Sequence, residues 1–150
     1  MVDEEIRKVV RKAGVKLRNK IIEKINSNIP PPNAPSTIKA KKSTHTLIDT
    51  GTMRRSIDTQ VIQEDEESID VASGIFEEGV AQYAIANEYG SVRTVTTKNK
   101  DNADEMHQGY SLIVIPERSF MRSAYDENIE EIYDNMAEEI GSIVSRKFKK

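Results

Sequence analysis

The chain has 150 residues and a net charge of −3, with 37% hydrophobic and 31% charged residues. This length suffices for the core of one domain, but so few apolar residues predict a thin core beneath a large polar surface. The lack of cysteine excludes disulfides, thiol catalysis and cysteine-based zinc sites. Because no apolar run approaches the roughly 18–20 residues that span a bilayer, and MVDEEIRKVV is too charged for a signal peptide, we expect one soluble domain over residues 1–150.

The charge is unevenly distributed along the chain. Residues 7–42 are rich in lysine and arginine, whereas residues 126–139 contain seven acids and no basic residue. Regions of opposite charge at separate places in a domain suit contacts between copies or partners. Two solvated helix faces would explain the same distribution.

Residues 3–28 are predicted to form an amphipathic helix, which Pro30, Pro31 and Pro32 bring to an end. Apolar residues recur at steps of three and four, and lysines recur at every fourth position on another face. The apolar stripe contains Ile6, Val10, Ala13, Leu17, Ile21 and Ile25, and the lysine row contains Lys8, Lys12, Lys16, Lys20 and Lys24. The next segment, residues 29–50, has no periodicity and is predicted to be an extended loop.

The middle of the chain is predicted to contain four strands and one short helix. Alternating or β-branched runs mark strands at residues 56–64, 68–75, 92–97 and 110–115. An acidic turn, EDEE, joins the first two strands and should be solvated. Residues 83–89 predict a short helix that ends at Gly90, and the polar residues 98–109 predict an exposed loop at the tip of the second hairpin.

A long final helix is predicted from near Ser119 to about residue 147. Its apolar stripe contains Tyr125, Ile129, Ile132, Met136, Ile140 and Ile143, and Tyr133, Ala137 and Val144 widen it. A stripe of this width indicates that one side of the helix packs on the sheet and another side packs on something else.

The sequence lacks the common signatures of catalysis. His45 and His107 lie in separate polar segments, and neither has a second residue at metal-ligand spacing. No nucleophile elbow, phosphate-binding loop or dinucleotide fingerprint occurs. We therefore predict no catalytic, cofactor-binding or metal-binding residues, no cofactor and no enzymatic activity.

Binding of nucleic acid is the alternative hypothesis. The lysine row of the first helix, together with Lys39, Lys41 and Lys42, could contact phosphates. No aromatic residues for base stacking are interleaved with these lysines. A solvated or salt-bridged helix face is the simpler interpretation of the row.

Three separated blocks carry a family resemblance. They are "LIDTGTMRRSI" at residues 47–57, "YAIANEYGS" at residues 83–91 and "IPERSFMRSAYDENIEEI" at residues 115–132. In this order, after a basic amphipathic helix, they resemble the neck and tail-completion proteins of tailed bacteriophages, which include head–tail joining and virion-morphogenesis families. Met53 replaces the usual leucine of the first block, and Glu117 stands where many relatives have a small residue.

The resemblance implies a non-enzymatic structural protein with an α+β fold. A small antiparallel sheet of about four strands would pack against long N- and C-terminal helices, with a short helix beside them. Such proteins form rings around the DNA channel, at the head–tail junction or at the head-proximal end of the tail. The implied partners are other copies of the chain and connector, portal-side or tail-tube proteins, and no membrane. The implied location is the virion, and the host cytoplasm during assembly.

A ring requires one patch of each subunit to meet a different patch of the next. The basic first helix and the acidic last helix would supply patches of opposite sign, and arginines near the Thr50-Gly51 turn and the last helix could bind acidic neighbours. Solubility at a strand edge explains Arg54 and Arg55 equally well, and helix-start chemistry explains every residue around Arg118 except that arginine. The interface candidates are Arg54, Arg55, Arg118, Lys12, Lys16, Lys20, Glu130, Glu131 and Asp134.

Overall fold

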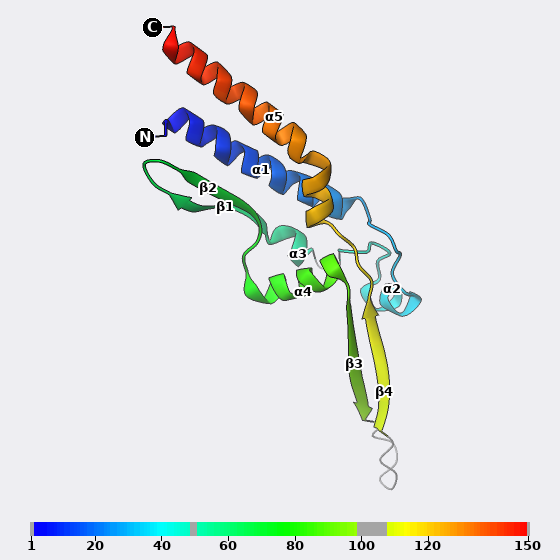
Figure 1. Cartoon of the computed structure of the whole chain (residues 1–150). Helices are drawn as coiled ribbons and strands as arrows, with labels where there is room; N and C mark the ends of the chain where they lie inside the picture. Colours follow the sequence, from blue (N-terminus) through cyan, green and yellow to red (C-terminus); the bar gives the residue numbers. More distant parts are fainter. Residues whose placement is uncertain (1, 49–50, 99–107, 150) are drawn as a thin grey trace.

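A computed structural model describes residues 2–48, 51–98 and 108–149 (Figure 1). In chain order its elements are α1 (Glu4–Asn26), α2 (Pro35–Lys41), α3 (Thr52–Arg55), β1 (Ile57–Glu64), β2 (Ile69–Ile75), α4 (Glu78–Tyr89), β3 (Ser91–Lys98), β4 (Gln108–Ile115) and α5 (Met121–Phe148). The predicted α+β class is confirmed, with its long terminal helices, short helix and four antiparallel strands.

The four strands form two separate hairpins instead of one sheet. β1 pairs with β2, and β3 pairs with β4. A bulge interrupts the first pairing between Val61 and Gln63, whereas the second is regular from one end to the other. Because α4 lies between β2 and β3, the second hairpin leaves in a new direction and projects away from the helices (Figure 1).

Helix α1 lies at the centre of the body. The β1–β2 hairpin lies along one side of α1, and α5 runs antiparallel to it along another side (Figure 1). The expectation that both terminal helices lie against a sheet therefore holds chiefly for α1, whereas α5 approaches β2 at its start, where a Cβ atom at Gly74 would lie 3.3 Å from Cε of Met121. Since α1 already covers the inner face of β1–β2, α5 packs chiefly on α1.

A glycine permits the close approach of α1 to the first hairpin. A Cβ atom at Gly14 would lie 2.5 Å from Cγ1 of Val71 and 2.8 Å from Cγ2 of Thr59. The carbonyl oxygen of Gly14 accepts hydrogen bonds from the hydroxyls of Thr59, at 3.2 Å, and Ser73, at 2.6 Å. The strand side chains therefore contact the helix backbone directly.

The hydrophobic core lies where the end of α1 meets α3, α4 and the start of α5. Met53 and Ile57 face one core across a helical turn, and Gly51 takes a positive φ of 79°. The buried cluster contains Ile21, Ile25, Ile29, Leu47, Met53, Ile57, Ala84, Phe120 and Ala124.

The predicted loop at residues 29–50 contains a helix that the sequence pattern did not indicate. α2 is seven residues long, too short for its apolar periodicity to be recognised, and proline is tolerated in its first turn. Of the predicted loop at residues 98–109, Lys98 ends β3 and Gln108 begins β4. Residues 99–107 lie outside the described part of the chain.

Replacing Gly14 with alanine is expected to destabilise the protein. Alanine favours a helix by about 1 kcal/mol over glycine, but the added methyl group would overlap Val71 and Thr59, and such overpacking costs about 1–3 kcal/mol. Gly141→Ala in α5 is the matched control, because a Cβ atom there meets nothing within 4 Å. In urea unfolding, Gly141→Ala should stabilise the protein, and a Gly14→Ala variant as stable as Gly141→Ala would contradict the packing described above.

Candidate assembly surfaces

The lysine row of α1 and the acidic side chains of α5 meet within one chain. Ion pairs join Lys12 to Glu139 at 2.7 Å, Lys16 to Glu131 at 3.3 Å and Lys24 to Glu127 at 2.6 Å. At the far end of the helix pair, Arg146 pairs with Glu5 and Lys147 with Asp3, while Lys20 pairs with Glu23 of its own helix at 3.3 Å. Exposed pairs contribute about 0.2–1 kcal/mol each, so their main effect is to fix how α5 lies on α1. A role for these lysines between copies stays a prediction.

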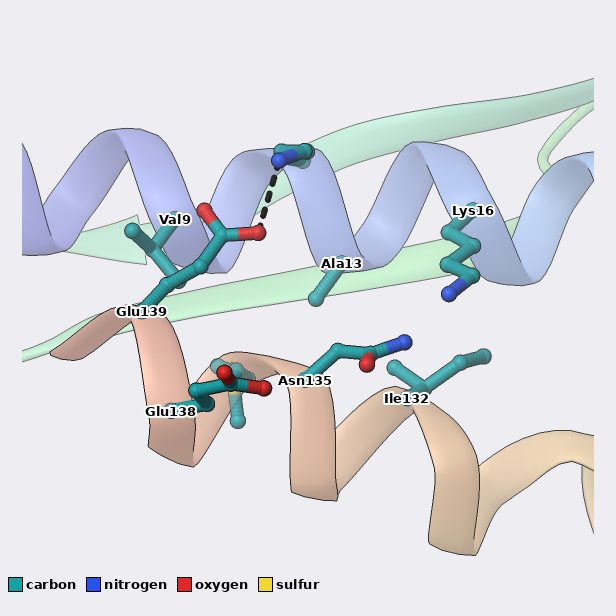
Figure 2. A pocket seen from close by; sticks show the side chains of 9 residues that line it. Val9, Ala13, Lys16, Ile132, Asn135, Glu138 and Glu139 are labelled. Carbon is teal, nitrogen blue, oxygen red and sulfur yellow. Dashed lines mark hydrogen bonds and ion pairs between the residues drawn. The ribbon is translucent and has the colours of Figure 1, made fainter. Parts of the chain in front are cut away.

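A groove of about 440 Å³ follows the seam between α1 and α5. Its floor is apolar, and Ala13 is small enough to leave the space open. Figure 2 shows Glu139 reaching from α5 towards α1, where it pairs with Lys12. Among the described residues, no group of three or more His, Cys, Asp or Glu is arranged to hold a metal ion. The groove is a packing seam between α1 and α5, with charged side chains such as Lys12 and Glu139 at its rim.

The turn between β1 and β2 is attached to the start of α1. The buried guanidinium of Arg7 donates to Glu64 at 3.2 Å and to the carbonyl oxygens of Ser68 and Asp65. Arg11 donates to the same carboxylate at 2.6 Å. The prediction of a fully solvated acidic turn is wrong for Glu64, because two arginines from a distant helix meet it.

Glu88 of α4 caps the N-terminus of α5. Its buried carboxylate accepts hydrogen bonds from the backbone N–H groups of Phe120, at 2.8 Å, Met121, at 2.9 Å, and Arg122, at 3.0 Å. The Ser119 hydroxyl and the Arg122 side chain donate to it as well. Burial raises the pKa of Glu88, but the backbone N–H groups of Arg122, Met121 and Phe120 outweigh burial and hold the pKa below its ordinary value.

The sequence missed this role of Glu88. From the sequence, Glu88 is interpreted as a packing or capping residue of its own short helix, and Ser119 as the residue that caps the last helix. The hydroxyl of Ser119 accepts a hydrogen bond from the backbone N–H of Ser123 at 3.2 Å. The backbone N–H groups at the start of the helix, those of Phe120, Met121 and Arg122, donate to the carboxylate of Glu88 instead. No short-range motif reveals a cap supplied from 32 residues away in the chain.

The predicted interface arginines lie in different environments. Arg118 is buried, and its Nε and Nη2 atoms donate to the carbonyl oxygen of Pro31 at 2.8 and 2.6 Å. Burial lowers the pKa of Arg118. It joins the segment after α1 to the start of α5, a geometry that favours the structural interpretation. Arg54 donates to Asn26 at 2.9 Å, and Arg55 is exposed on α3.

The second hairpin presents an apolar face to solvent. Val92 lies directly opposite Val114, and Leu112 follows two positions along β4 on the same side. Their exposed fractions are 67%, 62% and 69%. We call these three residues the hairpin face. The sequence predicted the hairpin but not that its aliphatic side chains remain uncovered.

A second apolar surface runs along α5. Tyr125, Tyr133, Ala137 and Val144 are exposed on the side that α1 does not cover, and we call them the outer stripe. Hydrogen bonding with Tyr133 raises the pKa of Tyr125, as expected for two rings lying along one stripe. The sequence predicted that this helix packs on something besides the sheet.

A third exposed group lies on α4, where Tyr89 stacks under the guanidinium of Arg122 at 4.4 Å and Ile85 is uncovered.

Comparison of the chain with models of protein families, with curated proteins and with solved structures finds no match. The family resemblance therefore depends on the three sequence blocks. In the described part of the chain, no helix is both long enough and apolar enough to cross a lipid bilayer.

Replacing Glu88 with glutamine should destabilise the protein by about 2–3 kcal/mol, because an amide loses the charge and turns an NH₂ group towards backbone donors. Glu117→Gln is the matched control. Its carboxylate also binds Arg122, at 2.5 Å, but is exposed, so its loss should cost less than about 1 kcal/mol. Urea unfolding measures both values, and equal effects would argue against a cap at Glu88.

The stability advantage of the wild type over Glu88→Gln should depend on pH. Since folding lowers the pKa of Glu88, its contribution is fully present above the unfolded pKa of roughly 4.3 and is lost as the pH falls through the folded pKa. Urea unfolding measured between pH 7 and pH 3 should show that the difference in the free energy of unfolding between the wild type and Glu88→Gln narrows only at the acidic end. A difference that is constant with pH would contradict the ionised cap.

Proposed function

We propose that this chain is a structural protein of a tailed phage or prophage virion. It would act as a tail-completion or head–tail joining component that assembles into a ring at the neck around the DNA channel. The observation that carries the proposal is the apolar surface left uncovered on separate elements of one small fold. Chief among these surfaces are the hairpin face and the outer stripe.

The hairpin face supports a role in assembly on physical grounds. An isolated two-stranded hairpin is marginally stable in water, and exposed apolar patches mark interaction sites. Among the strands that the structure describes, β3 and β4 pair only with each other, and all three residues of the hairpin face are more than 60% exposed. A partner that covers this face would bury aliphatic surface and stabilise the projecting hairpin.

The three blocks behind the resemblance meet in the structure. Met53 comes from the first block, Ala84 from the second and Phe120 from the third, and all three are buried in the same core cluster. Glu88 of the second block caps the helix that the third block begins. The blocks thus specify one junction of α3, α4 and α5, which favours a shared fold as the reason for the resemblance.

The alternative of nucleic-acid binding gains no support from the geometry. It depends on the lysine row of α1, and Lys12, Lys16 and Lys24 form ion pairs with α5. Those lysines would have to exchange a carboxylate for each phosphate that they contact.

The proposal is tested by deleting the gene from the phage or prophage that encodes it. Electron microscopy of the lysate should show filled heads and separate tails, because the ring that joins or completes them is missing. Supplying the wild-type protein from a plasmid should restore joined particles and plaque formation. Joined, infectious particles in the deletion strain would refute the proposed role.

A further inference from the structure

We propose that a cavity beside Arg118 binds one carboxylate together with the apolar group that carries it. The cavity lies where α2, α4, the end of β4 and the segment that precedes α5 meet (Figure 1). This site goes beyond the proposed function and does not depend on it, because its chemistry comes only from the residues that line the cavity.

Arg118 is buried without an ion pair. Only 4% of the residue is exposed, and arginines are rarely this buried unless an acidic group pairs with them. Within residues 2–48, 51–98 and 108–149, no carboxylate lies within ion-pair distance of its guanidinium. Glu88 and Glu117, which lie near it in the fold or in the sequence, both pair with Arg122 instead. The positive charge of Arg118 is therefore left uncompensated by the described residues.

The guanidinium of Arg118 has donors to spare. Nε and Nη2 both donate to the carbonyl oxygen of Pro31, at 2.8 and 2.6 Å. These bonds leave one N–H group of Nη2 and both N–H groups of Nη1 unused. In the part of the chain that the structure describes, Nη1 has no hydrogen-bond acceptor. The contact with Pro31 thus fixes the guanidinium in place, and its remaining donors are preorganised for an anion.

The lining of the cavity combines positive charge with an apolar wall. Lys41 lies in the lining together with Arg118, and none of the lining residues is acidic. Ile113, Val114 and Ile115 at the end of β4 form the apolar wall. The volume is about 350 Å³, within the range of roughly 300–1,000 Å³ that small-ligand cavities occupy. The cavity therefore has room for one side chain or one small organic molecule.

Two further buried polar residues line the same cavity. Asn87 donates from its side chain to the carbonyl oxygen of Tyr83 at 2.9 Å. The hydroxyl of Thr46 is buried and has no hydrogen-bond partner among the described residues. Buried polar groups without a partner are unusual in folded proteins. This concentration of buried polar groups around Arg118 distinguishes the cavity from the apolar surfaces described above.

A carboxylate fits this lining better than a phosphate. Arginine binds either group through parallel hydrogen bonds. A phosphate, however, presents oxygens on every side, and those that face the apolar wall of β4 would stay unpaired. A carboxylate carries a single negative charge, opposite to that of Arg118, and its carbon group would pack on Val114 and its neighbours.

Two sources can supply the carboxylate. One is a free organic acid. The other is an exposed acidic side chain of a protein that assembles with this chain, of the kind that Glu130 and Asp134, both predicted as interface residues, present on α5. Both sources would use the same contacts with Arg118, and they differ in what surrounds the carboxylate.

Titrations followed by nuclear magnetic resonance test the site and compare its sources. Isobutyrate should shift the Nε–H signal of Arg118 in a saturable manner, whereas isobutyramide, which has the same shape without the charge, should not. The peptide acetyl-Gly-Glu-Gly-amide represents the protein source, and its glutamine analogue is the control. Tighter binding of the glutamate peptide than of isobutyrate assigns the site to a protein side chain, and the reverse assigns it to a free acid. Either result supports a carboxylate site.

Two variants locate the bound carboxylate. Arg118→Lys keeps the charge but loses the planar set of donors, so its affinity for isobutyrate should fall by roughly tenfold or more. Because that variant also loses contacts with Pro31, Val114→Glu is a second test that leaves them in place. It puts a negative charge on the wall of the cavity and should weaken binding by a similar factor. Circular dichroism verifies that each variant is folded.

Leu112→Glu is the matched control for Val114→Glu. Leu112 lies on the same side of β4 and is similarly exposed, but it does not line the cavity. The same charge at this position should therefore leave the affinity for isobutyrate close to that of the wild type.

Several results would overturn the inference. They are an Arg118 signal that neither isobutyrate nor the glutamate peptide shifts, an equal shift from isobutyramide, tighter binding of inorganic phosphate than of isobutyrate, or unchanged binding in folded Val114→Glu. These measurements use the purified chain and are separate from the deletion experiment. Failure of the carboxylate site therefore leaves the proposed function standing, and failure of the proposed function leaves the site standing.

Discussion

The fold depends on the capping of α5 by Glu88. The carboxylate lies at the end of α4 and binds three consecutive backbone N–H groups at the start of α5. The cap also holds Phe120 in place at the start of α5. Because Phe120 is completely buried in the core cluster with residues of α1, α3 and β1, the junction connects the second half of the chain to the first. A buried carboxylate is costly unless it is fully hydrogen-bonded, so the cap tolerates little displacement of either helix.

With that junction in place, the rest of the molecule divides into a body and a projection. In the body, α1 is held on one side by the β1–β2 hairpin through Gly14 and the Arg7–Glu64 contact. On another side it is held by α5 through ion pairs. The projection is the β3–β4 hairpin, which starts at Ser91 and is separated from α4 by Gly90 alone. The same cap thus sets the direction from which the hairpin leaves.

This division explains why a chain with a thin core retains much exposed aliphatic surface. One core cluster at the junction suffices to orient the helices, and the outer stripe and the hairpin face contribute nothing to it. Apolar surface of this kind is useful to a protein whose stable form is an assembly, in which the neighbouring copy completes the burial. The acids of α5 that face α1, namely Glu127, Glu131 and Glu139, are paired with lysines within the chain.

The sequence by itself determined the elements that depend on local pattern. The period of α1, the positive φ of Gly51 and the strand alternation are all properties of neighbouring residues, and α2 was missed because seven residues show no period. Only the tertiary structure decided that the strands form two hairpins and that Glu88 caps a distant helix. Likewise, only the packing decided which acids of α5 face α1. The strand pairing, the Glu88 cap and the choice of acids that face α1 all depend on which surfaces, far apart in the sequence, meet in space. The spacing of residues along the chain carries no information about the distance between two elements.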